Sequence, residues 1–163
     1  TKRKVKLKGY ESAHSQTITD RCVEPFAFST NFIDIWAYDL EKNQNRVYKI
    51  ARISEVEILE EAWEHEPEHR KAATDCFRMN GKERIPISLK MTLKAKNLLI
   101  EEYPLASRDI SFEDGSWYLR TIVKDLTGVG RFVIGLADQI QIIDSTCLKE
   151  YLKWFKRTHL IFE

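Results

Sequence analysis

The first sixty residues alternate between apolar and polar positions over short stretches. Val5 and Leu7 alternate with Lys4, Lys6 and Lys8, a pattern typical of a strand with one buried face and one lysine-covered face. Four more runs are strand-like: TITDRCVEP (17–25), NFIDIWAYDL (31–40), RVYKI (46–50) and EVEILE (55–60). Such short strands cannot form a large sheet covered by helices. We therefore expect a small, bent, five-stranded barrel of the SH3 or Sm type over residues 1–60.

The pattern changes after residue 60. Residues 61–84 are polar, include the turn signal Asn80-Gly81, and are predicted to be a linker or crossover. Residues 85–163 then show the order strand, helix, strand, strand, helix, strand, which is that of a ferredoxin-like βαββαβ domain, followed by a C-terminal helix. The predicted fold class is therefore α+β, mostly β, with two modules.

The stretch DGSWYLR (114–120) lies in the second module. Asp114-Gly115 is a strong hairpin signal, so a strand should begin directly after it. Trp117 and Leu119 then share one face of that strand, and Tyr118 and Arg120 share the other. We expect Trp117 to pack under the helices of the ferredoxin-like domain.

Composition and charge exclude several classes of protein. Charged residues make up 31% of the chain and the net charge is +1, as in an ordinary globular protein. No apolar run is long enough for a membrane helix, and no signal peptide opens the chain. Three scattered cysteines without CxxC spacing indicate reduced thiols in a cytoplasmic protein. No motif calls for a cofactor.

One short motif matches a catalytic signature. HEPEH (65–69) has the H-E-x-x-H spacing of a zinc hydrolase, which works only on a continuous helix. Pro67 disfavours that helix at a cost of about 3 kcal/mol, and no third ligand is evident. No nucleophile elbow or phosphate-binding loop accompanies it. We therefore predict a non-enzymatic protein with no metal site, and an exposed linker at HEPEH; a zinc hydrolase is the less favoured alternative.

Basic and hydroxyl residues gather in the first module. Arg46 and Tyr48 share a strand face, Arg21 comes from the second strand, and Lys49 approaches Arg52 after a bend. Arginine forks and hydroxyls on one face of a small barrel can hold phosphates. Scattered cations that merely solvate the surface would produce the same pattern, so periodicity alone leaves both interpretations open.

Several spaced segments resemble the WYL domain of bacterial transcription regulators. The matching residues, in chain order, are Tyr10, Ser12, Arg21, Val23-Glu24-Pro25, Ala37-Tyr38-Asp39, Arg46, Tyr48 and Arg52-Ile53. Residues 85–155 resemble the C-terminal extension of the same regulators. Together the resemblance covers nearly the whole chain.

This resemblance implies the ligand-sensing, homodimeric part of a regulator whose DNA-binding helix-turn-helix would precede residue 1. The implied partners are DNA, through that absent domain, and a single-stranded DNA or nucleotide effector. The implied ligand-binding residues are Tyr10, Ser12, Arg21, Arg46, Lys49 and Arg52, with His14 as a further candidate. A purely structural dimerisation module is the main alternative.

The sequence departs from the WYL pattern at two places. Lys49 stands where the family usually has arginine, which keeps the charge but loses the bidentate fork. Ile33-Asp34-Ile35 stands where the family's name-giving Trp-Tyr-Leu belongs, with Trp36 one place later. The negative charge of Asp34 on this strand is expected to change or weaken ligand binding.

Overall fold

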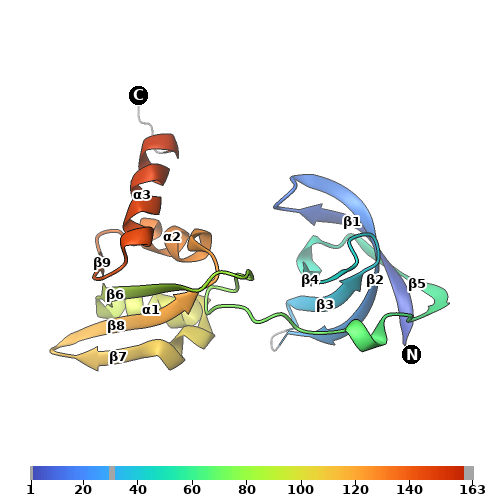
Figure 1. The fold of residues 1–163 in the computed structure, drawn as a ribbon, viewed down its shortest axis with the longest axis horizontal. Coiled ribbons are helices and arrows are strands. Elements are labelled where there is room, and N and C mark those ends of the chain that lie inside the picture. Colours follow the sequence, from blue (N-terminus) through green and yellow to red (C-terminus); the bar gives the residue numbers. More distant parts are fainter. Residues whose placement is uncertain (1, 30–31, 160–163) are drawn as a thin grey trace. The chain divides into compact units, whose positions relative to one another are not determined.

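The computed structural model describes residues 2–29 and 32–159. Two compact units divide the chain, Thr1–Ala72 and Ala73–Glu163, which we call the N-terminal and C-terminal units. Each unit contains one antiparallel sheet, of five and four strands respectively (Figure 1). The protein is therefore a mixed α+β protein dominated by strands, which confirms the predicted fold class at this level.

The N-terminal unit has all five strands that the alternating pattern predicts. They are β1 (Arg3–Ser12), β2 (Thr17–Phe28), β3 (Asp34–Asp39), β4 (Gln44–Lys49) and β5 (Glu55–Ala62), with a 3-10 turn, η1 (Ile50–Arg52), after β4. The strand order is β4-β3-β2-β1-β5. Among the described residues no pairing joins β4 to β5, so these strands are the two edges of the sheet, and the closed barrel stays a prediction.

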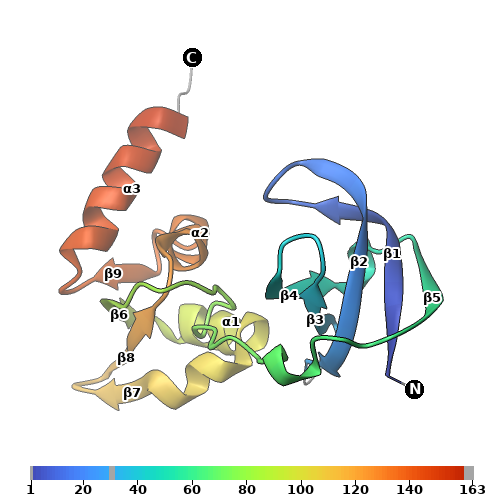
Figure 2. The ribbon, with the colours of Figure 1, turned by 45° about the vertical axis from the view of Figure 1, so that its right-hand side comes forward.

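The sheet of the N-terminal unit is strongly curved, most visibly in the long β1–β2 hairpin (Figures 1 and 2). The pairing register shifts between Leu7 and Tyr10 on β1 and between Pro25 and Ala27 on β2. Such bulges bend a strand and increase its twist. Gly9 lies in the first bulge with a φ of 60°, a conformation that glycine adopts without strain. The concave side encloses the buried core: Val5, Leu7, Tyr10, Val23, Ala37 and Tyr48.

The C-terminal unit also has the predicted succession of elements. They are β6 (Ile85–Met91), α1 (Leu93–Glu102), the 3-10 segment η3 (Pro104–Asp109), β7 (Ile110–Glu113), β8 (Ser116–Val123), α2 (Leu126–Gly135), β9 (Ile140–Ile142) and α3 (Thr146–His159). The strand order is β7-β8-β6-β9, with every pair antiparallel. Thr92 and Asp125 cap the first two helices by accepting hydrogen bonds from the N–H groups of Ala95 and Thr127.

The hairpin prediction for DGSWYLR is confirmed. β7 and β8 pair across Asp114-Gly115, and both turn residues have positive φ, 48° and 72°. Trp117 packs against the buried core of the C-terminal unit, with the ammonium of Lys96 on α1 lying 4.6 Å from its ring centroid. Trp117 therefore faces the helices, as predicted.

Residues 61–84, predicted to be a linker, contribute to both units. β5 extends to Ala62, and a 3-10 turn, η2 (Glu66–Glu68), follows it in the N-terminal unit. Phe77 is buried in the C-terminal core, and Asp75 accepts hydrogen bonds from the backbone N–H groups of nearby residues and of Lys124. The hydrogen bond from Lys124 joins residues that are distant in the chain, so the local sequence of this polar segment does not predict it.

Candidate functional site

The concave face of the N-terminal sheet brings together tyrosine and arginine residues from three strands, β1, β2 and β4. Arg21 pairs with the buried Leu7 and therefore points to the same face, because directly paired residues share a face. Arg46 pairs with the buried Ala37 on this same side. The rings of Tyr10 and Tyr48 meet edge to face, with centroids 4.9 Å apart. We call Tyr10, Arg21, Arg46 and Tyr48 the tyrosine–arginine cluster.

Asp39 anchors this cluster from β3. It is buried and accepts a hydrogen bond from the hydroxyl of Tyr48, while its other oxygen accepts bonds from the backbone N–H groups of Glu41 and Lys42, both at 3.0 Å. Burial and the neighbouring carboxylate raise the pKa of Tyr48 far above its ordinary value. Tyr48 is therefore a neutral hydrogen-bond donor and a rigid support, not a proton-transfer group.

The two arginines of the cluster differ in their partners. Arg21 Nη1 lies 2.9 Å from Glu41 Oε2, and only 18% of its side chain is exposed. Arg46 has no ion-pair partner among residues 2–29 and 32–159. Both guanidinium groups lie near enough to Tyr48 to oppose the rise in its pKa. Arg46 is therefore the cation of this cluster whose charge is free for an anion.

Lys49 forms an ion pair with Asp34, the other residue that departs from the WYL pattern. Its ammonium lies 2.7 Å from the carboxylate of Asp34, which is largely buried. The backbone N–H of Lys49 also reaches the hydroxyl of Tyr10 at 3.4 Å. The two unusual residues therefore neutralise each other, and the Lys49 charge is already engaged.

Ser12 and Arg52 lie apart from the tyrosine–arginine cluster but together with each other. They line a shallow hollow of about 290 Å³ beside the β1–β2 turn, along with Glu11 and Thr17. Arg52, like Arg46, has no ion-pair partner in the described part of the chain. His14 is exposed in the turn itself. Six of the seven predicted residues thus fall into two groups, and Lys49, which alternates with Tyr48 along β4, lies on the opposite face of the sheet. Within the described residues, Arg46 and Arg52 are the arginines of these groups that lack an ion-pair partner.

A second polar cluster was not predicted from the sequence. Glu24 is fully buried, and its carboxylate accepts hydrogen bonds from the backbone N–H groups of Glu64 and His65 at 2.8 and 3.0 Å. The His65 and His69 imidazoles also contact it, at 3.2 and 2.9 Å. We call Glu24, His65 and His69 the glutamate–histidine clamp. It holds the segment that follows β5 against β2.

Aromatic rings enclose the clamp. His65 stacks on Tyr38 at 4.6 Å, and His69 stacks on Phe26 at 4.7 Å with the edge of Trp63 at 4.8 Å. Burial alone would raise the pKa of Glu24, but the hydrogen bonds from the backbone and the imidazoles outweigh it, so its pKa lies below the ordinary value. Only the residue types, an acidic residue in an apolar strand and two nearby histidines, signal the clamp in the sequence.

This arrangement corrects the prediction for HEPEH. Glu66, Pro67 and Glu68 are exposed, as predicted, but the His69 side chain is almost fully buried. The motif also forms no continuous helix, since η2 spans only Glu66–Glu68. Within the described residues, no group of three or more His, Cys, Asp or Glu side chains is arranged to hold a metal ion.

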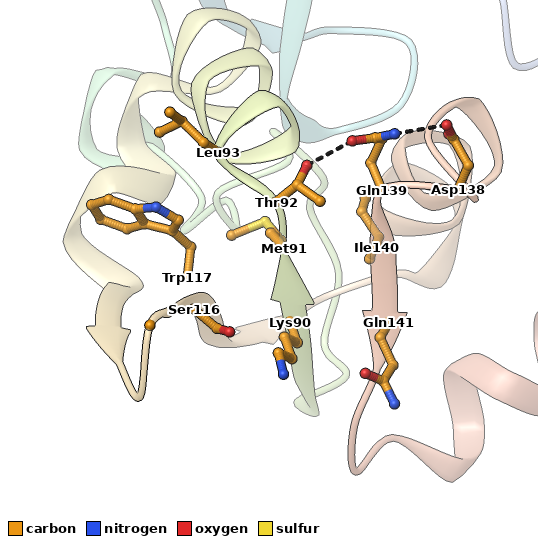
Figure 3. A pocket seen from close by; sticks show the side chains of 11 residues that line it. Lys90, Met91, Thr92, Leu93, Ser116, Trp117, Asp138, Gln139, Ile140 and Gln141 are labelled. Carbon is orange, nitrogen blue, oxygen red and sulfur yellow. Dashed lines mark hydrogen bonds between the residues drawn. The ribbon is translucent and has the colours of Figure 1, made fainter.

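The C-terminal unit contains a larger open cavity, of about 470 Å³ (Figure 3). Apolar side chains of Met91, Leu93, Trp117 and Ile140 form part of its wall. Gln139 is fixed there, because its amide accepts a hydrogen bond from the Thr92 hydroxyl and donates one to Asp138. No catalytic group that the sequence singles out lies in this cavity.

Comparisons with known proteins add little to this geometry. No helix in the described part of the chain combines the length and the apolar character needed to cross a membrane. No family model matches the chain, and no curated protein matches it. Thirteen chains of solved structures match, including the proteasome accessory factor B/C (PafBC) of Arthrobacter aurescens, at 17% identity and a TM-score of 0.41. The alignment covers 94% of this chain and 24% of PafBC, so the chain spans about a quarter of the length of that protein.

Proposed function

We propose that the chain is the effector-binding region of a WYL-type transcription regulator. In this proposal a phosphate-bearing ligand, a short single-stranded DNA or a nucleotide, binds the concave face of the N-terminal unit and extends to the hollow that Ser12 and Arg52 line. Arg46 and Arg52 provide the charge, and Tyr10 and Ser12 provide neighbouring hydroxyl groups. The strand order of the C-terminal unit, β7-β8-β6-β9, supports a ferredoxin-like extension domain.

The observation that carries the proposal is the unequal pairing of the basic residues. Glu41 and Asp34 engage Arg21 and Lys49, whereas Arg46 and Arg52 have no ion-pair partner in residues 2–29 and 32–159. Arg46 lies on the concave face beside the buried Tyr48, and Arg52 lines the hollow beside the β1–β2 turn, whereas cations that only improve solubility have no reason to lie in such recesses. Guanidinium groups left unpaired there match the planar geometry of phosphate.

The proposal extends to how the ligand would act. Ligand binding shifts an equilibrium between two arrangements of a homodimer, and this shift changes the DNA affinity of an N-terminal helix-turn-helix outside this chain. A ligand can do so only by the difference between its affinities for the two arrangements.

The test is binding of a fluorescent single-stranded oligonucleotide to the full chain, followed by anisotropy over a range of salt concentrations. Wild-type protein should bind with an affinity that falls steeply with salt. Arg46→Ala and Arg52→Ala should each weaken binding roughly tenfold and reduce the salt slope by about one ion. Arg131→Ala, an exposed residue of α2 in the other unit, is the matched control and should leave binding unchanged.

Three outcomes would contradict the proposal. Wild-type protein could fail to bind at low salt, Arg46→Ala and Arg52→Ala could both bind like wild type, or Arg131→Ala could weaken binding as much as they do. A dimer without any ligand response would instead favour the structural dimerisation module.

A further inference from the structure

The strand β5 forms one edge of the N-terminal sheet and has only one neighbour. Its inner edge pairs with β1. This pairing begins with Arg3 opposite Ala62 and ends with Lys8 opposite Glu55. Its outer edge pairs with no strand among the described residues, and it lies at the margin of the unit in two views (Figures 1 and 2). An unpaired strand edge offers a row of backbone N–H and C=O groups to an incoming chain.

The apolar side chains of β5 lie on the core-facing side of the sheet but remain exposed. Val56 pairs with Leu7 and Ile58 pairs with Val5, so each pair shares a face. Leu7 and Val5 are only 2% and 9% exposed, whereas Val56 and Ile58 are 54% and 68% exposed. The buried apolar row of β1 therefore continues onto β5 and stops there uncovered.

The opposite face and the end of β5 are acidic. Glu55 and Glu57 both pair with Lys8 of β1, at 3.2 and 3.1 Å. Glu60 and Glu61 have no ion-pair partner in the part of the chain that the structure describes. The surplus negative charge disfavours pairing of β5 with another acidic strand.

The strand β1 shows what kind of chain β5 recognises. Its lysines alternate with Val5 and Leu7, so it places lysine opposite glutamate on one face and apolar against apolar on the other. The outer edge of β5 offers the same alternation of glutamate and apolar side chains, and no strand of residues 2–29 and 32–159 pairs with it. The strand β1 is therefore a model, within this molecule, of the sequence pattern that complements the outer edge of β5.

We propose that the outer edge of β5 is a docking site for an extended segment of a partner protein in which lysine or arginine alternates with apolar residues. The segment adds a strand to the sheet by β-augmentation. Its backbone bonds to the free edge, its apolar residues cover Val56 and Ile58, and its basic residues face the β5 glutamates. This surface does not depend on the concave face around Arg46 or on the hollow that Arg52 lines.

The experiment uses the full chain and a labelled peptide, Lys-Arg-Lys-Val-Lys-Leu-Lys-Gly, which has the sequence of residues 2–9. The control peptide has the same composition with its valine and leucine adjacent, which removes the alternation. We expect the alternating peptide to bind about tenfold more tightly and to shift the amide NMR signals of β5. Ile58→Lys should weaken its binding at least about tenfold by removing apolar cover and adding like charge. Ile122→Lys, a comparable exposed change on β8, should not.

Equal binding of the two peptides would reduce the interaction to unspecific charge attraction and overturn the proposal. So would wild-type-like binding by Ile58→Lys, or peptide-induced shifts confined to other strands. A concentration-dependent self-association that Ile58→Lys abolishes would show that a second copy occupies this edge instead. Because Arg46→Ala and Arg52→Ala leave β5 intact, the oligonucleotide and peptide experiments can fail independently.

Discussion

The ammonium of Lys49 lies 2.7 Å from the carboxylate of Asp34, so the two residues that depart from the WYL pattern form an ion pair with each other. Asp34 lies on β3 and Lys49 at its paired position on β4. A substitution at one of these positions therefore changes the charge available at the other. Both side chains alternate with the concave-face residues Ile35 and Tyr48 and therefore lie on the opposite face, so a ligand reaches Lys49 only by passing around the β4 edge.

Removing the Asp34 charge should strengthen binding of a phosphate-bearing ligand. Asp34→Asn keeps the size of the side chain but frees the Lys49 ammonium. We expect severalfold tighter binding of a short single-stranded DNA at low salt, with a salt slope steeper by about one ion. Anisotropy titrations check this, and Asp114→Asn in the β7–β8 turn provides the same change of charge far along the chain. If Asp34→Asn and Asp114→Asn change the affinity equally, Lys49 does not contact the ligand.

Glu24 should make stability of the N-terminal unit depend on pH. Its folded pKa lies below its unfolded value, so its contribution is fully present above about pH 4.5 and is lost as pH falls through the folded pKa. Glu24→Gln should cost about 1–3 kcal/mol of unfolding free energy at pH 7, because the amide cannot accept all the N–H donors. The difference from wild type should shrink below about pH 4.5.

Urea unfolding followed through the amide NMR signals of β1 and β2 measures this difference for the N-terminal unit alone. The same signals from β6 and β8 provide the control, since Glu24 makes its contacts within the first unit. A Glu24→Gln penalty that stays constant from pH 7 to about pH 3 would show that the carboxylate charge is not what stabilises the clamp.

The two clamp histidines should contribute unequally to stability, and no metal should be involved. His69 is nearly buried and meets Phe26 and Trp63, whereas about a third of the His65 side chain is exposed. We expect His69→Ala to cost about 2–3 kcal/mol and His65→Ala about 1 kcal/mol. A chelator should leave Tm unchanged, and elemental analysis should find no stoichiometric zinc. A chelator-induced fall in Tm would revive the metal-site interpretation.

Local sequence patterns predicted the helices and strands of this fold, but they did not predict the contacts between residues that are distant in the sequence. The alternation around Val5 and Leu7 marks β1 because the period of a strand is a local property. The pairs Glu24–His69 and Lys49–Asp34 join residues on different elements, and no periodicity specifies them. The uncompensated charges of Arg46 and Arg52 could not be distinguished from Arg21 by sequence for the same reason. Whether an arginine has an acidic partner, as Arg21 has in Glu41, is decided only by the fold.

The glycines of the helix α2 also make contacts that the local sequence does not specify, and they provide a last prediction. Gly128 packs against Phe77 and Met79, and a Cβ on Gly130 would lie 2.5 Å from a ring carbon of Tyr151 on α3. Gly130→Ala should therefore destabilise the C-terminal unit by about 1–3 kcal/mol, despite the better helix propensity of alanine. Gly135→Ala is the matched control, because no atom lies within 4 Å of its added Cβ. It should be neutral or stabilising by up to about 1 kcal/mol. Urea unfolding of both variants measures the difference, and equal stability would mean that α3 moves away from α2 without cost.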